Sequence, residues 1–238
     1  MKLAVISDIH GNIDALEAVL KDIEKNKINI IYCTGDLVGY GPYPNEVIEK
    51  IRTRQIPTLQ GNYDKSVGEE LFACGCDYKD KNTMDLGAKS LYWSQEHTSE
   101  ENKRWLRELP KQLWVEAENK KVILVHGSTR KNNEYLYENS KELEEIAIEA
   151  NFDVLIFGHT HKPFHQTIRE VHFVNAGSVG KPKHAEGDAR GTYVLVDVTT
   201  NDVEVEVRYI AYDHEKVARD LVTAGLPEKF SDNLRGFL

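Results

Sequence analysis

Histidine and carboxylate side chains follow five separate apolar stretches of the chain, at the points where those stretches end. Asp-x-His and His-x-His spacings occur among them, and glycine stands beside most of them. Imidazoles and carboxylates together suit zinc, iron, manganese and nickel. The pattern therefore indicates metal chemistry, with seven candidate ligands: Asp8, His10, Asp36, Asn62, His126, His159 and His161.

Each of these residues alone has a simpler explanation. A histidine after a strand is more often structural, Gly35-Asp36 is typical of a turn, and Asp8-x-His10 fits a helix cap. The joint pattern favours a site, because the carboxyl ends of strands in an open α/β sheet face one crevice. Seven ligands exceed the roughly four to six of one ion, and they fit two ions that share a carboxylate.

The spacing of the paired ligands also predicts their direction. Side chains alternate along extended backbone, so Asp8 and His10 should point to one side, and so should His159 and His161. We expect both pairs to reach the same crevice.

Strands and helices alternate in the first part of the chain. We expect a strand at 2–7, a helix from about residue 13 capped by Asn12 or Asp14, and a strand at 28–33, which together favour parallel pairing. A helix at 46–54, for which Asn45 is a possible cap, and an extended segment at 57–59 follow.

The rest of the chain predicts a mixed architecture. Residues 65–110 are expected to form an inserted helical segment over the sheet, and the tail beyond Gly225 is polar and expected to be loose. The whole of 1–238 is expected to be a single α/β domain with two mixed sheets covered by helices. Further strands are expected at 113–116, 121–125, 153–157, 164–169, 171–175, 191–198 and 202–212, and helices at 142–150 and 213–221.

Composition limits the classes of partner. Hydrophobic residues make up 40% of the 238, enough for a sizeable core, and the net charge of −9 argues against long nucleic acids and acidic membranes. Cys33, Cys74 and Cys76 are too few and too irregular for a disulfide framework. The apolar stretch in the N-terminal MKLAVISD is too short for the apolar region of a signal peptide. No stretch reaches the roughly 20 apolar residues of a membrane span, so we expect a cytoplasmic protein.

The motifs together resemble the calcineurin-like binuclear metallophosphoesterases, in particular their small bacterial and archaeal YfcE-like phosphodiesterase branch. The family pattern is matched, in order, by Asp8-Ile9-His10, Gly35-Asp36, Gly61-Asn62-Tyr63-Asp64, His126-Gly127 and Gly158-His159-Thr160-His161.

The resemblance implies a fold and a role for each ligand. The fold is a four-layer αββα sandwich of two mixed β-sheets flanked by helices. Asp8, His10 and His161 would hold one metal, and Asp36 would bridge to a second ion. Asn62, His126 and His159 would hold that second ion.

One position departs from the family pattern. The family often has a histidine where Tyr63 stands, and that histidine assists the leaving group, with Asp64 as its usual partner. Tyrosine is a weaker acid near neutrality, so we expect Tyr63 to give less help to poor leaving groups. The resemblance thus implies Asn62, Tyr63 and Asp64 as catalytic residues.

Two glycine-containing loops are candidates for shaping the substrate site. Tyr40 and Tyr43 lie in the loop 39–45, where their rings could stack on a base, although a purely structural loop explains the sequence equally well. Lys181 lies in the loop 175–182 and could add charge toward an anion, although a tight turn is a comparable explanation.

The expected function is metal-dependent hydrolysis of phosphoesters, by a hydroxide that bridges two divalent ions. Manganese is the expected metal, with iron, zinc or nickel as alternatives. The expected substrate is a small phosphodiester or nucleotide. A phosphoprotein or a dinucleoside polyphosphate is an alternative substrate, and a non-catalytic binding module is the alternative class. The sequence does not determine the oligomeric state.

Overall fold

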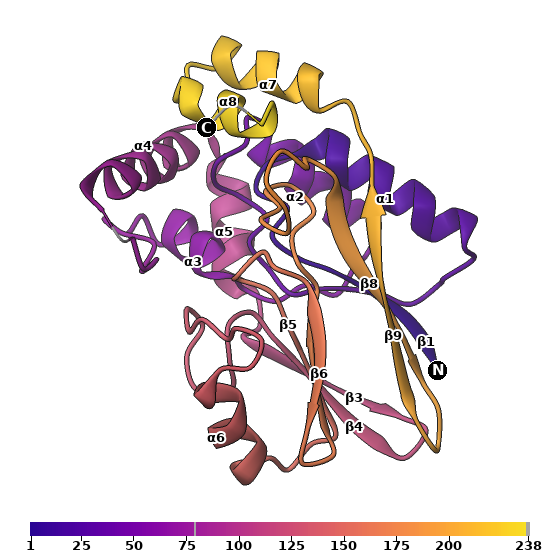
Figure 1. Cartoon of the computed structure of the whole chain (residues 1–238). Helices are drawn as coiled ribbons and strands as arrows, with labels where there is room; N and C mark the ends of the chain where they lie inside the picture. The colour runs from indigo at the N-terminus through magenta and orange to yellow at the C-terminus, as the bar shows by residue number, and fades with distance from the viewer. Residues whose placement is uncertain (79, 237–238) are drawn as a thin grey trace.

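The computed structural model describes residues 1–78 and 80–236 (Figure 1). None of the helices in this part of the chain is long and apolar enough to cross a membrane. The strands are β1 (Lys2–Ile6), β2 (Ile31–Cys33), β3 (Gln112–Ala117), β4 (Lys120–Val125), β5 (Val154–Phe157), β6 (Phe164–Ile168), β7 (Val171–Asn175), β8 (Gly191–Val198) and β9 (Val203–Ile210). The helices are α1 (Ile13–Lys25), α2 (Pro44–Thr53), α3 (Asn62–Gly68), α4 (Lys81–His97), α5 (Glu100–Glu108), α6 (Lys141–Glu149), α7 (His214–Thr223) and α8 (Glu228–Leu234).

The strands form two mixed sheets. The first has the order β2-β1-β8-β9, with β1 parallel to β2 and antiparallel to β8. The second has the order β3-β4-β5-β7-β6, with a parallel centre of β4, β5 and β7 between antiparallel edge strands. The parallel β1-α1-β2 unit that the sequence predicts is confirmed.

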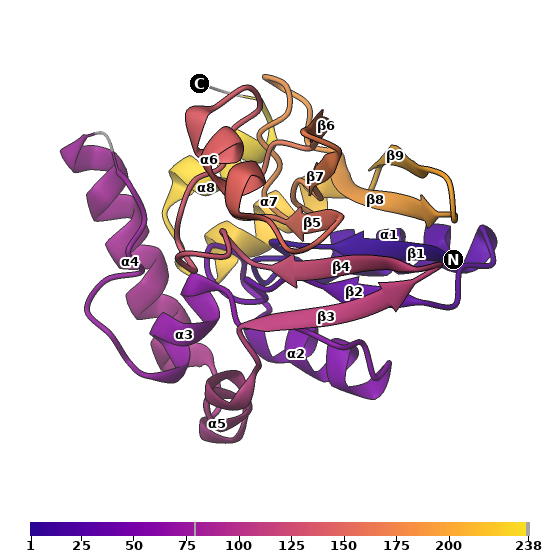
Figure 2. The same ribbon diagram turned by 90° about the horizontal axis from the view of Figure 1, so that it is seen from below.

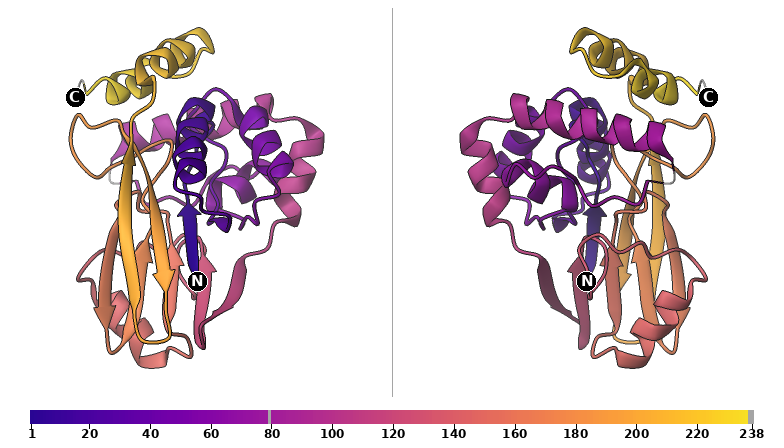
Figure 3. Two further views of the ribbon diagram at one scale, coloured as in Figure 1. Left: turned by 90° about the vertical axis from the view of Figure 1, so that its right-hand side faces the viewer. Right: turned by 90° about the vertical axis from the view of Figure 1, so that its left-hand side faces the viewer.

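The two sheets stack, and helices cover their outer faces (Figures 2 and 3). Alternation along β1 shows the layering, because Leu3 and Val5 pack between the sheets while Ala4 and Ile6 pack with α1 and α2. Helix α6 covers the second sheet through Leu143 and neighbouring apolar residues. This is the four-layer αββα arrangement expected from the sequence.

Local sequence explains where the helices begin. The Asn12 side chain accepts a hydrogen bond from the Ala15 amide at 3.0 Å and caps α1, as predicted. The expectation for Asn45 is wrong: α2 begins earlier, at Pro44, and Asn45 lies inside it. The Asn45 carboxamide accepts from the Ser99 amide at 2.9 Å, so it ties α2 to the start of α5.

Two further expectations need correction. The segment 57–59 contributes only one bridge, from Thr58 to Cys33, rather than a strand. The tail beyond Gly225 is not loose over the residues described, because Leu226 and, on α8, Phe230 are buried against α7. These apolar residues are spaced too sparsely to reveal an amphipathic helix in a polar segment. Residues 237–238 lie outside the described residues.

Helices α3, α4 and α5 occupy most of the segment predicted to be a helical insertion. They lie on one side of the molecule, while α7 and α8 lie across the end of the sheets toward which β1 runs (Figures 1 and 3). The carboxyl ends of β1 and of its parallel neighbour β2 therefore face the C-terminal helices.

Candidate metal centre

Two clusters of potential metal ligands lie at the carboxyl ends of the strands. Asp8, His10 and His161 form one cluster, and Asp36, His126 and His159 form the other. Within each cluster the potential ligand atoms all lie within 4.8 Å of one another. Since loops after β1, β2, β4 and β5 supply these residues, each cluster draws on both sheets.

Asn62 completes the set of seven, and Asp36 links the two clusters. Asp36 Oδ2 lies 3.5 Å from His126 Nε2 and 3.8 Å from His10 Nε2, between the two clusters. Asn62 Oδ1 lies 3.0 Å from His126 Nε2. All seven predicted ligands thus meet in one place, in the two groups that the family resemblance implies, with a carboxylate where a bridge is expected.

Hydrogen bonds fix the direction in which the imidazoles face. His10 Nδ1 donates to the Val38 carbonyl at 2.8 Å, and His161 Nδ1 donates to the Lys181 carbonyl at 2.6 Å. Burial lowers the pKa of both rings, so each is neutral and keeps a lone pair on Nε2. Those two Nε2 atoms lie 3.2 Å apart. Two lone pairs repel each other at this distance, so a cation bound between them would stabilise the arrangement.

Two buried atoms of the ligand clusters lack hydrogen-bond partners among the described residues. Asp8 Oδ1 and His159 Nε2 are both buried and unpaired, one in each cluster. Unpaired buried polar atoms are costly, and bound cations would satisfy both. The donor set of nitrogen and oxygen atoms therefore fits two divalent metal ions.

Electrostatics favour positive charge at the same place. Burial lowers the pKa of His159 to about 4 and that of His161 to about 3, which keeps both imidazoles in the neutral, metal-binding form. Burial alone would raise the pKa of Asp8, but the neighbouring imidazoles hold it well below its usual range. Burial also opposes charge on His126, yet Asp36 and the other carboxylates raise its pKa to about 9. These carboxylates stabilise a cation at this position.

The backbone at the ligands differs from the expectation. Asp8, His10, Asp36, His159 and His161 all have positive φ, between 49° and 64°. The prediction that extended backbone directs the side chains of Asp8 and His10, and of His159 and His161, to the crevice is therefore wrong. Residues in the left-handed conformation direct these side chains instead. Such conformations are strained for residues other than glycine, and strain of this kind concentrates at functional sites.

Glycines permit the close approach that this packing needs. A Cβ atom at position 61 would overlap the Asp36 carboxylate, and one at position 158 would overlap Ser7 and Asp8. Gly61 and Gly158 therefore let backbone lie directly against two of the candidate ligands.

Tyr63 and Asp64 lie next to these ligands but do not contact each other through their side-chain oxygens. The Tyr63 hydroxyl lies 3.2 Å from the Tyr78 hydroxyl. Asp64 accepts hydrogen bonds from the amides of Asp36 at 2.7 Å and Leu37 at 2.8 Å. Asp64 thus positions the loop that carries Asp36.

A cavity of about 350 Å³ opens over the clusters, and we call it the metal cavity. Tyr40 and Lys181 line it, as the sequence suggested, and the Lys181 ammonium lies 4.2 Å from the centre of the Tyr40 ring. The structure places Tyr43 elsewhere, with its hydroxyl donating to Asp220 at 2.7 Å. Sequence inspection missed other tyrosines of the metal cavity, which are Tyr78, Tyr135 and Tyr137.

These tyrosines escaped notice because they follow no strand and belong to no motif. Only the fold brings the segments before α4 and before α6 to the metal cavity. Tyr135 lies against a candidate ligand, with its ring centre 4.1 Å from that of His159. An aromatic wall of this kind suits an organic group attached to a phosphate.

The cysteines beside Asn62 also need a correction. Cys74 and Cys76 form a local disulfide across Gly75, with Cα atoms 5.5 Å apart, whereas the sequence predicted no disulfide framework. The carbonyl of Cys74 accepts from Asn62 Nδ2 at 3.0 Å, so the Asn62 oxygen is turned toward His126. The pairing is local to one turn and was not visible from the overall cysteine spacing.

Fold and site together define a metallophosphoesterase. A family model, the calcineurin-like phosphoesterase superfamily domain, matches residues 1–201, and the chain belongs to this superfamily. Its members are metal-dependent, and the chain is a phosphoester hydrolase.

Individual relatives agree with this assignment. The chain is 32% identical to MJ0912 of Methanocaldococcus jannaschii, itself described as uncharacterized, over 98% of this chain and 96% of that one. It is 26% identical to the phosphodiesterase YfcE of Escherichia coli, over 85% of this chain and 89% of that one.

Solved structures share the fold over the full length. A metallophosphoesterase from Sphaerobacter thermophilus matches with a TM-score of 0.79 and 26% identity, covering 100% of this chain and 99% of that one. The protein PH1004 from Pyrococcus horikoshii matches with a TM-score of 0.84 and 24% identity, covering 100% of this chain and 98% of that one. At this level of identity the match supports the fold only.

Proposed function

We propose that this protein hydrolyses small phosphodiesters or nucleotides with two divalent metal ions, and that Mn²⁺ is the first ion to test. The observation that carries the proposal is the contact between His10 Nε2 and His161 Nε2 at 3.2 Å, beside Asp8 Oδ1 at 3.2 Å from His161 Nε2. Three electron-pair donors converge on one point, where a metal ion is the simplest satisfying partner.

Each candidate ligand has a place in this proposal. Asp8, His10 and His161 would hold one ion, and Asp36 would be shared by both. His126, His159 and Asn62 would hold the other. A pair of such ions supplies Lewis acidity and lowers the pKa of water toward neutrality.

Other side chains of the metal cavity would bind and orient the phosphoryl group. Lys181 brings an amine to the metal cavity, and Tyr63 brings a hydroxyl. Burial and the neighbouring Lys183 lower the pKa of Lys181 to about 7, so an anionic substrate would favour its protonated form. Burial raises the pKa of Tyr63 well above its ordinary value, with Tyr40 and Tyr78 contributing. The Tyr63 hydroxyl therefore stays protonated, so it donates a hydrogen bond to the substrate rather than a proton to the leaving group.

Two features support a small substrate. The metal cavity holds about 350 Å³ and has tyrosines on its walls, which suits a nucleotide-sized organic group. The net charge of −9 opposes long polyanions, because binding them depends on many basic contacts.

The test compares wild type with Asp36→Asn, using bis-p-nitrophenyl phosphate and added Mn²⁺. We expect metal-dependent turnover in the wild type and a loss of at least about a hundredfold in the variant, since the shared ligand is weakened. Asp85→Asn is the matched control, because Asp85 is exposed on α4. Elemental analysis should find two ions per wild-type chain and fewer in Asp36→Asn.

Failure would take a clear form. Wild-type protein that binds no divalent ion, or that turns over the diester equally well after Asp36→Asn, would contradict the proposal. Full activity in Asp85→Asn would show that the activity lost in Asp36→Asn is lost because of the change at position 36, and not because of the change in net charge.

A further inference from the structure

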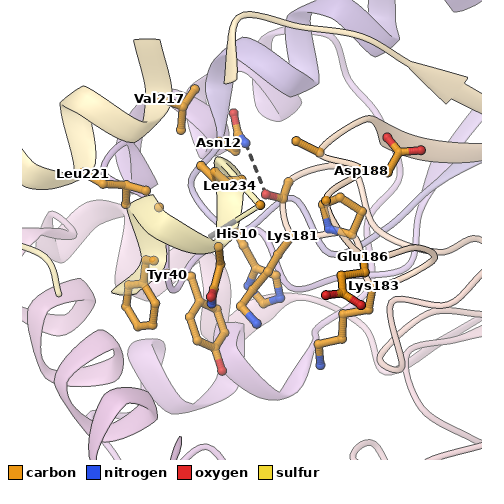
Figure 4. Close-up of a pocket in the computed structure, with 18 of the residues that line it drawn as sticks. His10, Asn12, Tyr40, Lys181, Lys183, Glu186, Asp188, Val217, Leu221 and Leu234 are labelled. Atoms are coloured by element: carbon orange, nitrogen blue, oxygen red, sulfur yellow. Dashed lines mark hydrogen bonds between the residues drawn. The ribbon is translucent and has the colours of Figure 1, made fainter. Parts of the chain in front are cut away.

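A second cavity, of about 250 Å³, lies between the C-terminal helices and the loop 180–189 (Figure 4). Val217 and Leu221 of α7 and Phe230 and Leu234 of α8 form its apolar wall. We call this cavity the C-terminal pocket. An apolar pocket kept open beside a reaction centre is typical of a ligand site.

The opposite wall limits what the C-terminal pocket can hold. Pro182 and Ala185 add apolar surface, and Glu186 and Asp188 add negative charge. Asp188 is neutralised by Arg190 at 2.6 Å, but Glu186 has no cation partner among the ion pairs of the described residues. The Glu186 carboxylate on this wall therefore suits an uncharged organic group better than an anion.

The C-terminal pocket adjoins the metal cavity. His10, Tyr40, Lys181 and Lys183 line both of them. The Tyr40 ring joins the two walls, because its centre lies 5.0 Å from that of His10 and 5.4 Å from that of Phe230. One molecule could place its phosphoryl group at the metal ligands and an attached organic group against α7 and α8.

The residues that form the apolar wall lie outside the part of the chain that matches the superfamily. That match ends at residue 201, whereas α7 begins at His214 and α8 ends at Leu234. The wall therefore lies outside the matched phosphoesterase domain, and segments outside a shared domain can set substrate choice without altering the metal ligands.

We infer that the C-terminal pocket binds an uncharged aromatic or apolar group esterified to the substrate phosphorus, so that α7 and α8 select phosphoesters of bulky organic alcohols over those of methanol-sized ones. The inference rests on the proposed function, because it places the phosphoryl group at the metal ligands. Lys181 and Lys183, at the boundary between the cavities, would hold the anionic oxygens on the metal side.

The test measures binding of two phosphonates to the Mn²⁺-loaded full chain by calorimetry. Phenylphosphonate and methylphosphonate share the anionic group and are not hydrolysed at the P–C bond. We expect phenylphosphonate to bind about tenfold more tightly, because the ring is removed from water. In Val217→Phe, which fills the pocket, the preference should fall below about threefold.

Val222→Phe is the matched control. Val222 lies on the same helix but is 45% exposed and does not line the C-terminal pocket, so the tenfold preference should persist. If Val217→Phe fails to fold, Ala185→Phe fills the pocket from the exposed loop without disturbing helix packing. Equal binding of the two phosphonates in the wild type, or an unchanged preference in both filled variants, would overturn the inference.

The two failures are distinguishable. Loss of metal binding, or of Asp36-dependent hydrolysis, counts against the proposed function. Metal-dependent hydrolysis combined with a phenyl preference that neither filling substitution alters counts against the C-terminal pocket alone, and places the ring in the metal cavity.

Discussion

Tyr63 is the residue whose surroundings most constrain the chemistry. Its ring meets the His10 ring edge to face, with centres 5.4 Å apart, and its side chain is only 1% exposed. Its hydroxyl faces Tyr78, and burial keeps it protonated. A residue held in this way can donate a hydrogen bond near a phosphoryl group, but it is a poor general acid.

Tyr63→His should therefore change leaving-group preference. We expect turnover of alkyl phosphoesters to rise by about tenfold relative to aryl ones, since alkoxides need protonation more than phenolates do. The measurement is kcat/KM for an alkyl and an aryl ester of the same phosphate. Tyr63→Phe is the control, because it removes the hydroxyl without supplying an acid, and a parallel change for both esters would rule out this role.

At the scale of the elements, the second sheet carries a histidine pair on its edge strand β6 and the neighbouring strand β7. His165 of β6 and His172 of β7 lie with ring nitrogens 3.0 Å apart, away from the metal ligands. Burial lowers the pKa of both rings. His172 lowers that of His165 further, and Lys120 lowers that of His172, while Asp202 and Asp153 act in the opposite direction.

The pair predicts a pH dependence of stability. Because the folded pKa values lie below those of the unfolded chain, the unfolded state takes up protons first as the pH falls. The stability contributed by the neutral pair is thus present above about pH 6.5 and is lost below it. We expect the free energy of unfolding of His165→Gln/His172→Gln to fall less between pH 7 and pH 5 than that of wild type.

The expected difference is below about 1 kcal/mol, because both rings are partly exposed and solvent screens them. Urea unfolding at the two pH values measures it. His97→Gln is the control, because His97 lies on α4 and stacks on Trp93 rather than on a residue of the second sheet, and the substitution should leave the difference between the two pH values unchanged. An identical pH dependence in wild type and the double variant would show that the pair does not titrate as described.

At the scale of the whole molecule, the candidate centre joins the two sheets. Asp8 and His10 follow β1 of the first sheet, while His161 follows β5 of the second, and they meet in one cluster. The second cluster likewise combines Asp36 with His126 and His159. Bound ions would therefore tie the sheets together and relieve the repulsion between converging lone pairs.

Removal of metal should accordingly destabilise the entire fold. With Mn²⁺ at about a hundred times its Kd, binding contributes about 2.7 kcal/mol, which corresponds to a shift of about 5–10 °C in Tm. Thermal unfolding with and without a chelator measures the shift. The shift in Tm should be smaller for Asp36→Asn than for wild type. A wild-type Tm that does not change when the chelator is added would argue against ions that link the sheets.

Much of this molecule could be predicted from its residues. Period-two and helical apolar patterns located β1, α1, β5 and the β8–β9 hairpin, because these elements bury one face or both. The meeting of the candidate ligands could be predicted because five predicted strands end in such residues, and the carboxyl ends of those strands point to one crevice. The boundaries of α2 and the helix α8 were missed, since their packing partners are distant in sequence.

The sequence by itself determined the fold class and which side chains could bind metal, since both follow from local patterns of polarity and residue type. Only the tertiary structure decided how those side chains are aimed, through left-handed turns and hydrogen bonds to the carbonyls of Val38 and Lys181. It also brought α8 to the edge of the metal cavity, with α7 beside it. These features depend on contacts between segments far apart in the chain, which no local pattern encodes.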